Sequence, residues 1–291
     1  MKVERRAVEA HLRAPFVSAQ ETVESVSLTL VSMTDDTGAT GYGESVDAAQ
    51  WDLAGRRAGQ PVWQLLGAED APAVEVNATI AAPDRASAAS AAAAARDAGY
   101  RCVKVKVGLG DDAGRLAAVR AAAGPEMAIR VDANGSWTVA EALAALRALE
   151  PMGIELCEQP AADVDACATV ASESPIPIAL DESAPDALDD RVCDAVCLKV
   201  ARFVGISGVV FAARRARQAG YGVYLASMLD GPLGIAAALH AAAVVHPDYA
   251  CGLATLDLFE DRPDPLPPSE GRIAVPTGPG LGDGLLDWYG G

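Results

Sequence analysis

From residue 74 onward, short runs rich in β-branched residues alternate with alanine- and leucine-rich segments of helical period, such as AEALAALRAL (140–149). The runs recur at intervals of roughly 18 to 28 residues, which leaves room for one helix between neighbours. Runs that are apolar on successive residues are typical of strands buried on both faces. The runs are VEVNATI (74–80), CVKVKV (102–107), AIRVDA (128–133), IELCEQ (154–159), IPIALD (176–181), AVCLKV (195–200), GVYLAS (222–227) and ACGLAT (250–255).

Eight strand–helix units with short connections favour an α/β fold of the (β/α)8 type, a closed parallel barrel, over an open sheet. A doubly wound open sheet would carry a glycine-rich turn after its first strand. The segment NATIAAPDR (77–85) that follows the first run contains no glycine. We therefore predict a barrel over residues 73–259.

The chain before residue 73 has a different pattern. VSLTLVSMTDDTGATGYGES (26–45) places β-forming residues around an Asp-Asp-Thr-Gly turn, which predicts a hairpin in a small antiparallel sheet. WDLAGRRAGQPVWQLLG (51–67) is helical in pattern and stops at Gly67. We expect residues 1–72 to form a small N-terminal α+β domain and the Pro- and Gly-rich residues 260–291 to return toward it.

Carboxylates end three successive runs of the predicted barrel. Asp132 ends the third, Glu158 the fourth and Asp181 the fifth, at separations of 26 and 23 residues, each the length of one strand–helix unit. Neighbouring parallel strands finish at the same rim of a barrel, where barrel active sites lie. Three carboxylates gathered there repel one another unless a cation joins them, and oxygen ligands select Mg²⁺, with Mn²⁺ as an alternative. The spacing therefore predicts one divalent metal site.

Lysines flank this predicted metal site. Lys104 and Lys106 alternate on the second run and so face the same way, and Lys199 ends the sixth run. We expect Lys104 to form a salt bridge on its strand. We expect the metal and the neighbouring lysines to lower the pKa of Lys106 and Lys199, so that each can act as a base at neutral pH.

A metal held by carboxylates, with a lysine on each side, suits the removal of a proton from the carbon next to a substrate carboxylate. The metal would stabilise the negative charge that develops as the proton leaves. We therefore expect a small carboxylate as substrate, and Lys106 and Lys199 as the catalytic residues.

The net charge of the chain argues against some classes of binding partner. The chain carries 40 acidic and 23 basic residues, a net charge of −17, whereas nucleic acid or an anionic membrane would require clustered Lys and Arg. We expect neither as a partner, and we find no apolar stretch of the length of a membrane span and no signal-peptide pattern. Six cysteines without paired spacing fit a reduced, cytoplasmic protein. The oligomeric state stays open, with a homo-oligomer as one alternative.

These motifs resemble those of the enolase superfamily, in particular its muconate-lactonizing-enzyme subgroup. The resemblance covers nearly the whole chain, from PF-x-x-A near residue 16 and GYGE at 41–44 onward. The matching motifs of the barrel are K-x-K at 104–106, DAN at 132–134, EQP at 158–160, DES at 181–183 and LKV at 198–200.

The resemblance implies a modified TIM barrel with an N-terminal capping domain, and a Mg²⁺-dependent lyase or isomerase. Lys106 would be the abstracting base, and Lys199 the lysine of the opposite face, a second acid/base or a cation that stabilises the enolate. A mandelate-racemase-type enzyme would carry a histidine on the seventh strand, and GVYLAS has none. His11, His240 and His246 are therefore expected to be structural or exposed.

Within the subgroup, VNATIAA, SMLDGPLGIAAAL and YACGLAT are similar to actinobacterial-type o-succinylbenzoate synthases, which dehydrate a cyclohexadiene carboxylate on the menaquinone pathway. On this likeness, the residues beside the substrate are Lys104, Asn134, Ser227, Met228 and Asp230. MLDGPLG and TLDLF are also similar to muconate cycloisomerases, and N-succinylamino-acid racemases stay open as well. Dipeptide epimerases match less well, because GLATLDL lacks their D-x-D at the eighth strand.

One departure from the family lies in the capping domain. Family members carry several helices between the GYGE element and the W-D-L-A-G-R helix, whereas here Glu44-Ser45-Val46 leads almost directly into that helix. We therefore expect a shortened capping domain. A non-enzymatic alternative follows from it, namely a barrel that binds a ligand without turnover.

Overall fold

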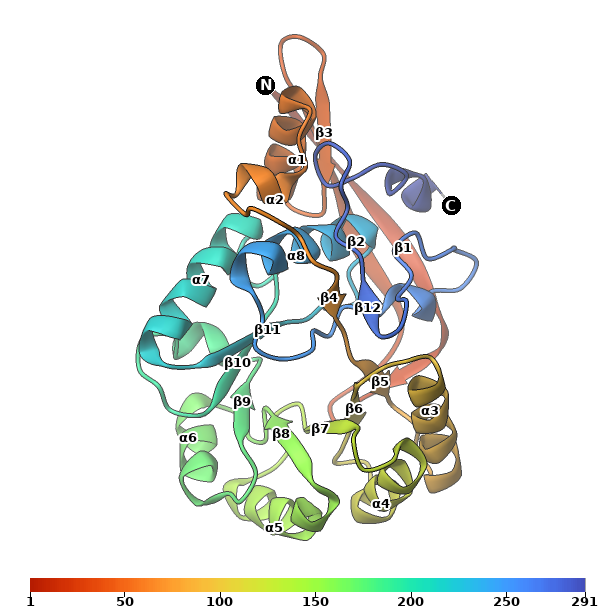
Figure 1. Ribbon diagram of the computed structural model, residues 1–291, viewed down its shortest axis with the longest axis vertical. Helices are drawn as coiled ribbons and strands as arrows, with labels where there is room; N and C mark the ends of the chain where they lie inside the picture. Colours follow the sequence, from red (N-terminus) through yellow and green to blue (C-terminus); the bar gives the residue numbers. More distant parts are fainter. Residues whose placement is uncertain (291) are drawn as a thin grey trace.

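The N-terminal part of the chain forms a three-stranded antiparallel sheet. The computed structural model describes residues 1–290, and in it β1 (Lys2–Val17), β2 (Thr22–Thr34) and β3 (Thr40–Gly43) lie in the order β1-β2-β3 (Figure 1). The hairpin predicted around Asp-Asp-Thr-Gly joins β2 to β3. In its turn the Asp35 carboxylate accepts hydrogen bonds from the backbone N–H groups of Thr37 (2.8 Å) and Ala39 (3.1 Å), as a turn-forming Asp does.

Two helices follow this sheet instead of the single helix expected over residues 51–67. α1 (Val46–Ala58) begins only two residues after β3, where the Ser45 side chain caps its N-terminus, and α2 (Val62–Leu65) is one turn long. Gly59 separates the two helices because it adopts a left-handed conformation (φ 65°), which ends α1 eight residues before Gly67.

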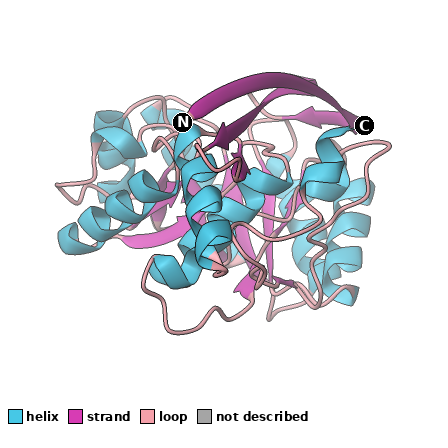
Figure 2. Ribbon diagram, turned by 90° about the horizontal axis from the view of Figure 1, so that it is seen from above, coloured by secondary structure: helices cyan, strands magenta, loops and turns pink. Residues whose placement is uncertain are grey.

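Seven parallel strands form the wall of the barrel, and each pairs with the next in sequence. Helices cover the outside of this wall (Figures 1 and 2). The strands are β5 (Ala78–Ile80), β6 (Cys102–Lys106), β7 (Ala128–Asp132), β8 (Ile154–Glu158), β9 (Ile178–Leu180), β10 (Ala195–Leu198) and β11 (Gly222–Leu225). The helices are α3 (Arg85–Asp97), α4 (Asp112–Ala123), α5 (Val139–Leu149), α6 (Val164–Glu173), α7 (Ile206–Ala219) and α8 (Pro232–Val245).

The first and eighth predicted strands differ from the expectation. The first run is divided: β4 (Val74–Glu75) pairs with β12 (Arg272–Ile273) outside the barrel, and only β5 joins the wall. The eighth run forms no regular strand, and it closes the barrel through two isolated parallel bridges, Val76↔Cys251 and Ala226↔Gly252. The wall is continuous there because the backbone of residues 251–252 bonds to both neighbours, although this pairing is only two residues long. The predicted α/β barrel is thus present, with a short eighth side.

The strand residues are buried on both faces, as the continuous apolar runs predicted. On β6 all five residues are buried, with Val103 and Val105 alternating with Lys104 and Lys106. Alanines allow the covering helices to approach the wall closely, and Ala88 of α3 is fully buried. The lysines therefore lie inside the barrel while the valines pack under the helices.

The C-terminal segment packs along β1. Leu12 forms a bridge with Phe259, and Glu260 donates its backbone N–H to the carbonyl of His11 (3.0 Å). The short helical turns of this and other connections are Glu150–Met152, Ala184–Asp186, Leu256–Leu258 and Leu286–Gly290. Among residues 1–290, no helix is both long and apolar enough to cross a membrane.

Candidate active site

The predicted acids and lysines meet at the carboxyl ends of the strands. Lys106, Asp132 and Glu158 are aligned residue by residue at the ends of β6, β7 and β8. Asp181 and Lys199 each lie one residue beyond the end of their strand, β9 and β10, rather than within it. All five side chains are buried at this rim.

Two of the three acids form a compact group with a thiol. One oxygen of Glu158, one of Asp181 and Cys197 Sγ lie within 4.8 Å of one another. Asp181 Oδ1 is buried and accepts no hydrogen bond from the described residues, and the Arg202 guanidinium lies 3.8 Å from it. A buried carboxylate oxygen without a donor is costly unless a ligand satisfies it, so this group fits a cation.

Asp132 is joined to the group through Lys104 rather than directly. Lys104 Nζ lies 3.1 Å from Asp132 Oδ2 and donates to Glu158 Oε1 at 2.9 Å. The predicted salt bridge of Lys104 is therefore present, although with two acids at once. An ion shared by all three carboxylates would take the place that this ammonium holds between Asp132 and Glu158, and the three oxygen donors suit Mg²⁺.

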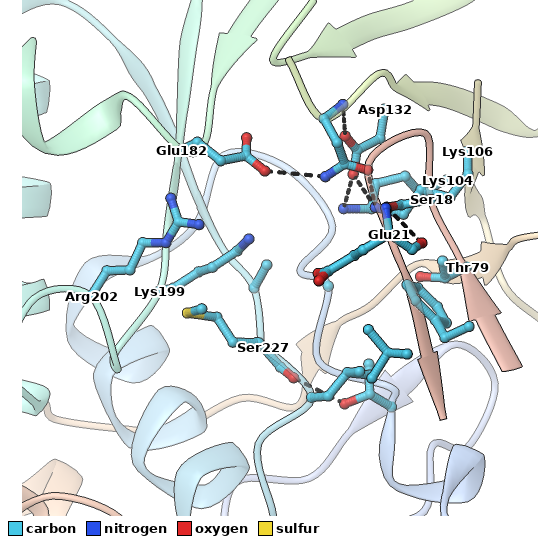
Figure 3. A pocket seen from close by; sticks show the side chains of 18 residues that line it. Ser18, Glu21, Thr79, Lys104, Lys106, Asp132, Glu182, Lys199, Arg202 and Ser227 are labelled. Carbon is cyan, nitrogen blue, oxygen red and sulfur yellow. Dashed lines mark hydrogen bonds and ion pairs between the residues drawn. The ribbon is translucent and has the colours of Figure 1, made fainter. Parts of the chain in front are cut away.

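The two remaining lysines are each held by one acid. Lys106 Nζ donates to Asp132 Oδ2 (2.7 Å) and to Asn134 Oδ1 (2.8 Å), and Lys199 Nζ donates to Asp181 Oδ2 (2.5 Å). Lys199 lies on the opposite side of the cavity from Lys104 and Lys106 (Figure 3). A ligand in the cavity would therefore have an amine on each side.

The pKa values show how the carboxylates hold these charges. Burial opposes the charge of Lys104, but Glu158 and Asp132 outweigh it and raise the pKa of Lys104 well above its usual value. The pKa of Lys199 is likewise raised, because Asp181 outweighs burial. The lowered pKa predicted for Lys199 assumed a bound metal ion and stays a prediction for the metal-bound site, whereas here the carboxylate in direct contact raises the pKa.

Burial and neighbouring charges also shift the pKa values of the acids. Burial raises the pKa of Glu158 more than Lys104 lowers it. Burial also acts on Asp132, but Lys104 and Lys106 together lower the pKa of that carboxyl well below its usual value. Asp132 is thus held as a carboxylate more strongly than Glu158 is.

A cavity of about 180 Å³ opens above this network. Of the residues expected beside the substrate, Lys104, Asn134, Ser227 and Met228 line it. Other lining residues, which the sequence analysis did not assign to the site, include Phe16, Ser18, Glu21, Val23, Glu182 and Arg202. The first four of these come from the adjoining ends of β1 and β2 and the turn between them. The ring of Phe16 lies 5.6 Å from Lys106 Nζ. The N-terminal sheet therefore supplies one wall of the cavity.

Asp230 does not line this cavity. It lies in a neighbouring cavity of about 240 Å³ together with Glu44, and Met228 lines both. Burial raises the pKa of Asp230 to about 6 and that of Glu44 to about 8, and the charge of Asp230 adds to the effect on Glu44. Asp230 is therefore not placed beside the substrate as predicted, because its side chain lines the neighbouring cavity, while its backbone N–H donates to Ser227 Oγ (3.1 Å).

Two further side chains position the acids. Gln159 Oε1 accepts the backbone N–H of Asp181 (2.8 Å), and the Tyr224 hydroxyl donates to Glu158 Oε2 (2.7 Å). Tyr224 is buried inside the barrel, and the Arg130 guanidinium lies 5.0 Å from its ring. Sequence reasoning did not identify these two residues, because Gln and Tyr in a buried run carry no charge pattern.

The three histidines take no part in this rim. His240 lies within α8, where it accepts the backbone N–H of Trp63 (3.2 Å), and burial lowers its pKa to about 4. His11 is exposed on β1, and His246 ends α8. GVYLAS contains no histidine, and the basic side chains at the rim are lysines.

Comparisons with known proteins agree on one family. Residues 86–286 match the family described as enolase C-terminal domain-like. The chain is 35% identical over 257 residues to the o-succinylbenzoate synthase of Thermobifida fusca, covering 82% of this chain and 79% of that protein. It is 31% identical over 254 residues to the D-Ala-D/L-Ala epimerase of Cytophaga hutchinsonii, covering 83% and 69%.

Solved structures agree in fold. The muconate lactonizing enzyme of Pseudomonas fluorescens, complexed with muconolactone, has a TM-score of 0.90 at 25% identity and covers 99% of this chain and 97% of its own. The dipeptide epimerase of Cytophaga hutchinsonii, complexed with Mg and a dipeptide, has a TM-score of 0.87 at 25% identity, covering 98% and 97%. These relatives are lyases and isomerases, and the chain is an enzyme of this kind. The chain belongs to the enolase superfamily, in its muconate-lactonizing-enzyme subgroup.

Proposed function

We propose that the protein removes a proton from the carbon next to a substrate carboxylate in a Mg²⁺-dependent reaction, and that this reaction is the dehydration carried out by o-succinylbenzoate synthases. The observation that carries the proposal is the placement of Lys106 and Lys199 on opposite sides of one cavity above a buried carboxylate group. The likeness to the Thermobifida fusca o-succinylbenzoate synthase favours dehydration among the reactions of the subgroup.

Asp132, Glu158 and Asp181 would hold Mg²⁺, with Mn²⁺ as an alternative. When bound, the ion supplies positive charge that stabilises the negative charge developing on the substrate carboxylate. The buried Asp181 Oδ1, which has no donor among the described residues, supports this assignment.

Lys106 is the proposed base. Its Nζ is held at the cavity by Asp132 Oδ2 and Asn134 Oδ1, so the amine has a fixed position when it has lost its proton. Lys106 Nζ takes the α-proton, the neighbouring carbon–oxygen bond breaks, and the same ammonium returns the proton to the departing hydroxyl oxygen. The products are water and a new carbon–carbon double bond, and one lysine is enough for such a syn elimination.

Lys199 has a different role in this reaction. Its Nζ is held by Asp181 on the other side of the cavity, where a cation stabilises negative charge on the substrate. The same placement favours a second candidate, an N-succinylamino-acid racemase or cycloisomerase, because a two-base racemisation needs an amine on each face. Epimerisation of a dipeptide is disfavoured, because residues 250–255 at the eighth side of the cavity contain no carboxylate.

The test is an assay of the purified protein with Mg²⁺ and the cyclohexadiene carboxylate precursor of o-succinylbenzoate, with muconate and N-succinyl amino acids in parallel. We expect loss of 18 mass units from the first substrate as water leaves, and abolition of this activity in Lys106→Ala. Racemisation without dehydration would support the second candidate. If no substrate exchanges its α-proton in D₂O, the protein is a ligand-binding barrel and the proposal is wrong.

Dehydration of this substrate would place the protein on the menaquinone pathway. We also propose a reducing, cytoplasmic setting, which is supported by six cysteines that are all buried and free.

A further inference from the structure

A cysteine lies beside the predicted metal ligands. β10 places Cys197 inside the barrel, two residues before Lys199, and its Sγ lies within 4.8 Å of one oxygen of Glu158 and one of Asp181. All three side chains are buried. The thiol therefore belongs to the same compact group as these two acids.

The thiol also differs from the other cysteines of the chain. Cys102, Cys157, Cys167, Cys193 and Cys251 each direct Sγ toward a backbone carbonyl. Cys197 Sγ has no such partner among residues 1–290, and the neighbouring Asp181 Oδ1 is buried without a donor. Cys197 Sγ and Asp181 Oδ1 are thus both left without a hydrogen-bond partner among the described residues.

We propose that Glu158, Asp181 and Cys197 form a Zn²⁺ site that shares two of its ligands with the proposed Mg²⁺ site. Thiolate sulfur is a soft ligand that Zn²⁺ accepts and Mg²⁺ does not, whereas Asp132, on the far side of Lys104, completes an oxygen set for Mg²⁺. Three protein ligands with one open position are typical of reactive zinc sites. On binding, the thiol proton passes to solvent and Sγ bonds the ion.

The geometry allows this site with a small adjustment. Tetrahedral coordination at Zn–O of about 2.1 Å and Zn–S of about 2.3 Å places the ligand atoms about 3.5 Å apart. The three atoms lie within 4.8 Å of one another, so each pair would close by no more than about 1.3 Å. A change of side-chain rotamers can supply this movement without a change of the strands.

Because Glu158 and Asp181 belong to both sites, the two ions exclude each other. Zn²⁺ is therefore expected to inhibit the Mg²⁺-dependent reaction by competition. The binding of Zn²⁺ does not depend on the proposed function, whereas the inhibition does.

The first test uses Co²⁺ as a spectroscopic substitute for Zn²⁺ in the full-length protein. We expect a near-ultraviolet thiolate-to-cobalt charge-transfer band in the wild type and its loss in Cys197→Ser. Cys157→Ser is the matched control, since Cys157 is buried on β8 next to Glu158 but bonds a carbonyl, and it should keep the band. No band in the wild type, or a band that survives in Cys197→Ser, would overturn the proposal.

The second test measures affinity by calorimetry. Cys197→Ser should lower the affinity for Zn²⁺ by about tenfold or more and change that for Mg²⁺ by less than about twofold. Glu158→Gln should weaken both ions. If Zn²⁺ affinity is the same in Cys197→Ser and the wild type, the thiol is only a buried apolar group. A charge-transfer band without turnover of any carboxylate would support the zinc site and contradict the proposed function, and turnover without a band would do the reverse.

Discussion

The two ends of the barrel both bury charged side chains, but they satisfy them differently. At the base, Arg130 is 1% exposed, and it donates to Glu155 Oε2 (2.5 Å) and to the carbonyl of Ala250 (2.7 Å), with the rings of Tyr224 and Tyr249 close to its guanidinium. At the rim, three lysines face three acids, yet Asp181 Oδ1 and Cys197 Sγ have no hydrogen-bond partner among the described residues.

Cavity size does not show which end of the barrel holds the candidate active site. The cavity at the base, which Arg130 and Glu155 line, has about 380 Å³ and exceeds the 180 Å³ at the rim. What differs is that the base is closed by its own bonds, which is typical of a structural ion pair, while the rim keeps free ligand atoms. Unused buried ligand atoms therefore identify the site better than volume does.

The largest expected effect is the loss of activity caused by a substitution at the rim. Lys106→Ala removes the proposed base and should lower kcat/KM for the cyclohexadiene carboxylate by about a thousandfold, because a general base contributes about 10² to 10⁴. Unfolding by urea should remain cooperative. Arg101→Ala, an exposed cation of the basal cavity, is the control and should keep wild-type turnover. Retention of more than about a tenth of the activity in Lys106→Ala would contradict the assigned role.

A substitution at the base of the barrel should lower the stability of the fold rather than the activity. Arg130→Met leaves Glu155 and the carbonyl of Ala250 without their donor, and we expect the free energy of unfolding to fall by about 2 to 4 kcal/mol. Urea denaturation measures this, and Mg²⁺ affinity of the folded variant should stay near the wild-type value. An unchanged unfolding midpoint would show that the base is not a structural ion pair.

Tyr224 connects the two ends, since its ring lies against Arg130 and its hydroxyl binds Glu158. Tyr224→Phe frees Glu158 Oε2, and we expect Mg²⁺ affinity to fall by about tenfold, because groups that orient a metal ligand contribute about 10- to 100-fold. The comparison is Tyr249→Phe, which keeps a ring beside Arg130 and should bind Mg²⁺ normally. Equal affinities in the two variants would show that the hydroxyl does not orient Glu158.

The smallest effect concerns pH. The pKa of Glu44 is raised to about 8 in the folded protein, so the folded state binds the proton more tightly than the unfolded state. This contribution to stability is complete below pH 4.5 and is lost as the pH rises through about 8. Between pH 7 and 8.5, the wild type should lose on the order of 1 kcal/mol relative to Glu44→Gln in urea denaturation. Glu9→Gln, on the exposed face of β1, should behave as the wild type does.

Much of the site could be predicted because it follows the strand–helix period. Asp132, Glu158 and Asp181 are one unit apart, and parallel strands bring residues with that spacing to one rim. The eighth side could not be predicted as two bridges, because ACGLAT has the same apolar pattern as a longer strand.

Other features of the site could not be predicted from a pattern of neighbouring residues in the sequence. Phe16 and Glu21 reach the cavity from a turn more than 80 residues before Lys106, and only the packing of the N-terminal sheet on the barrel places them there. Cys197 could not be recognised as a candidate ligand because a thiol in an apolar run is indistinguishable from a small hydrophobic side chain. The contact with Asp181 that raises the pKa of Lys199 could not be predicted either, because the sequence does not show which charge lies nearest.

The sequence by itself determined the barrel, the rim at which its acids gather and the lysines that flank them, since periodicity and strand direction are local properties of the chain. Only the tertiary structure decided which side chains touch. Lys104 lies between two acids, Asp230 turns into a separate cavity and Cys197 faces Asp181, because the twist and closure of the sheet set distances that no spacing along the chain encodes.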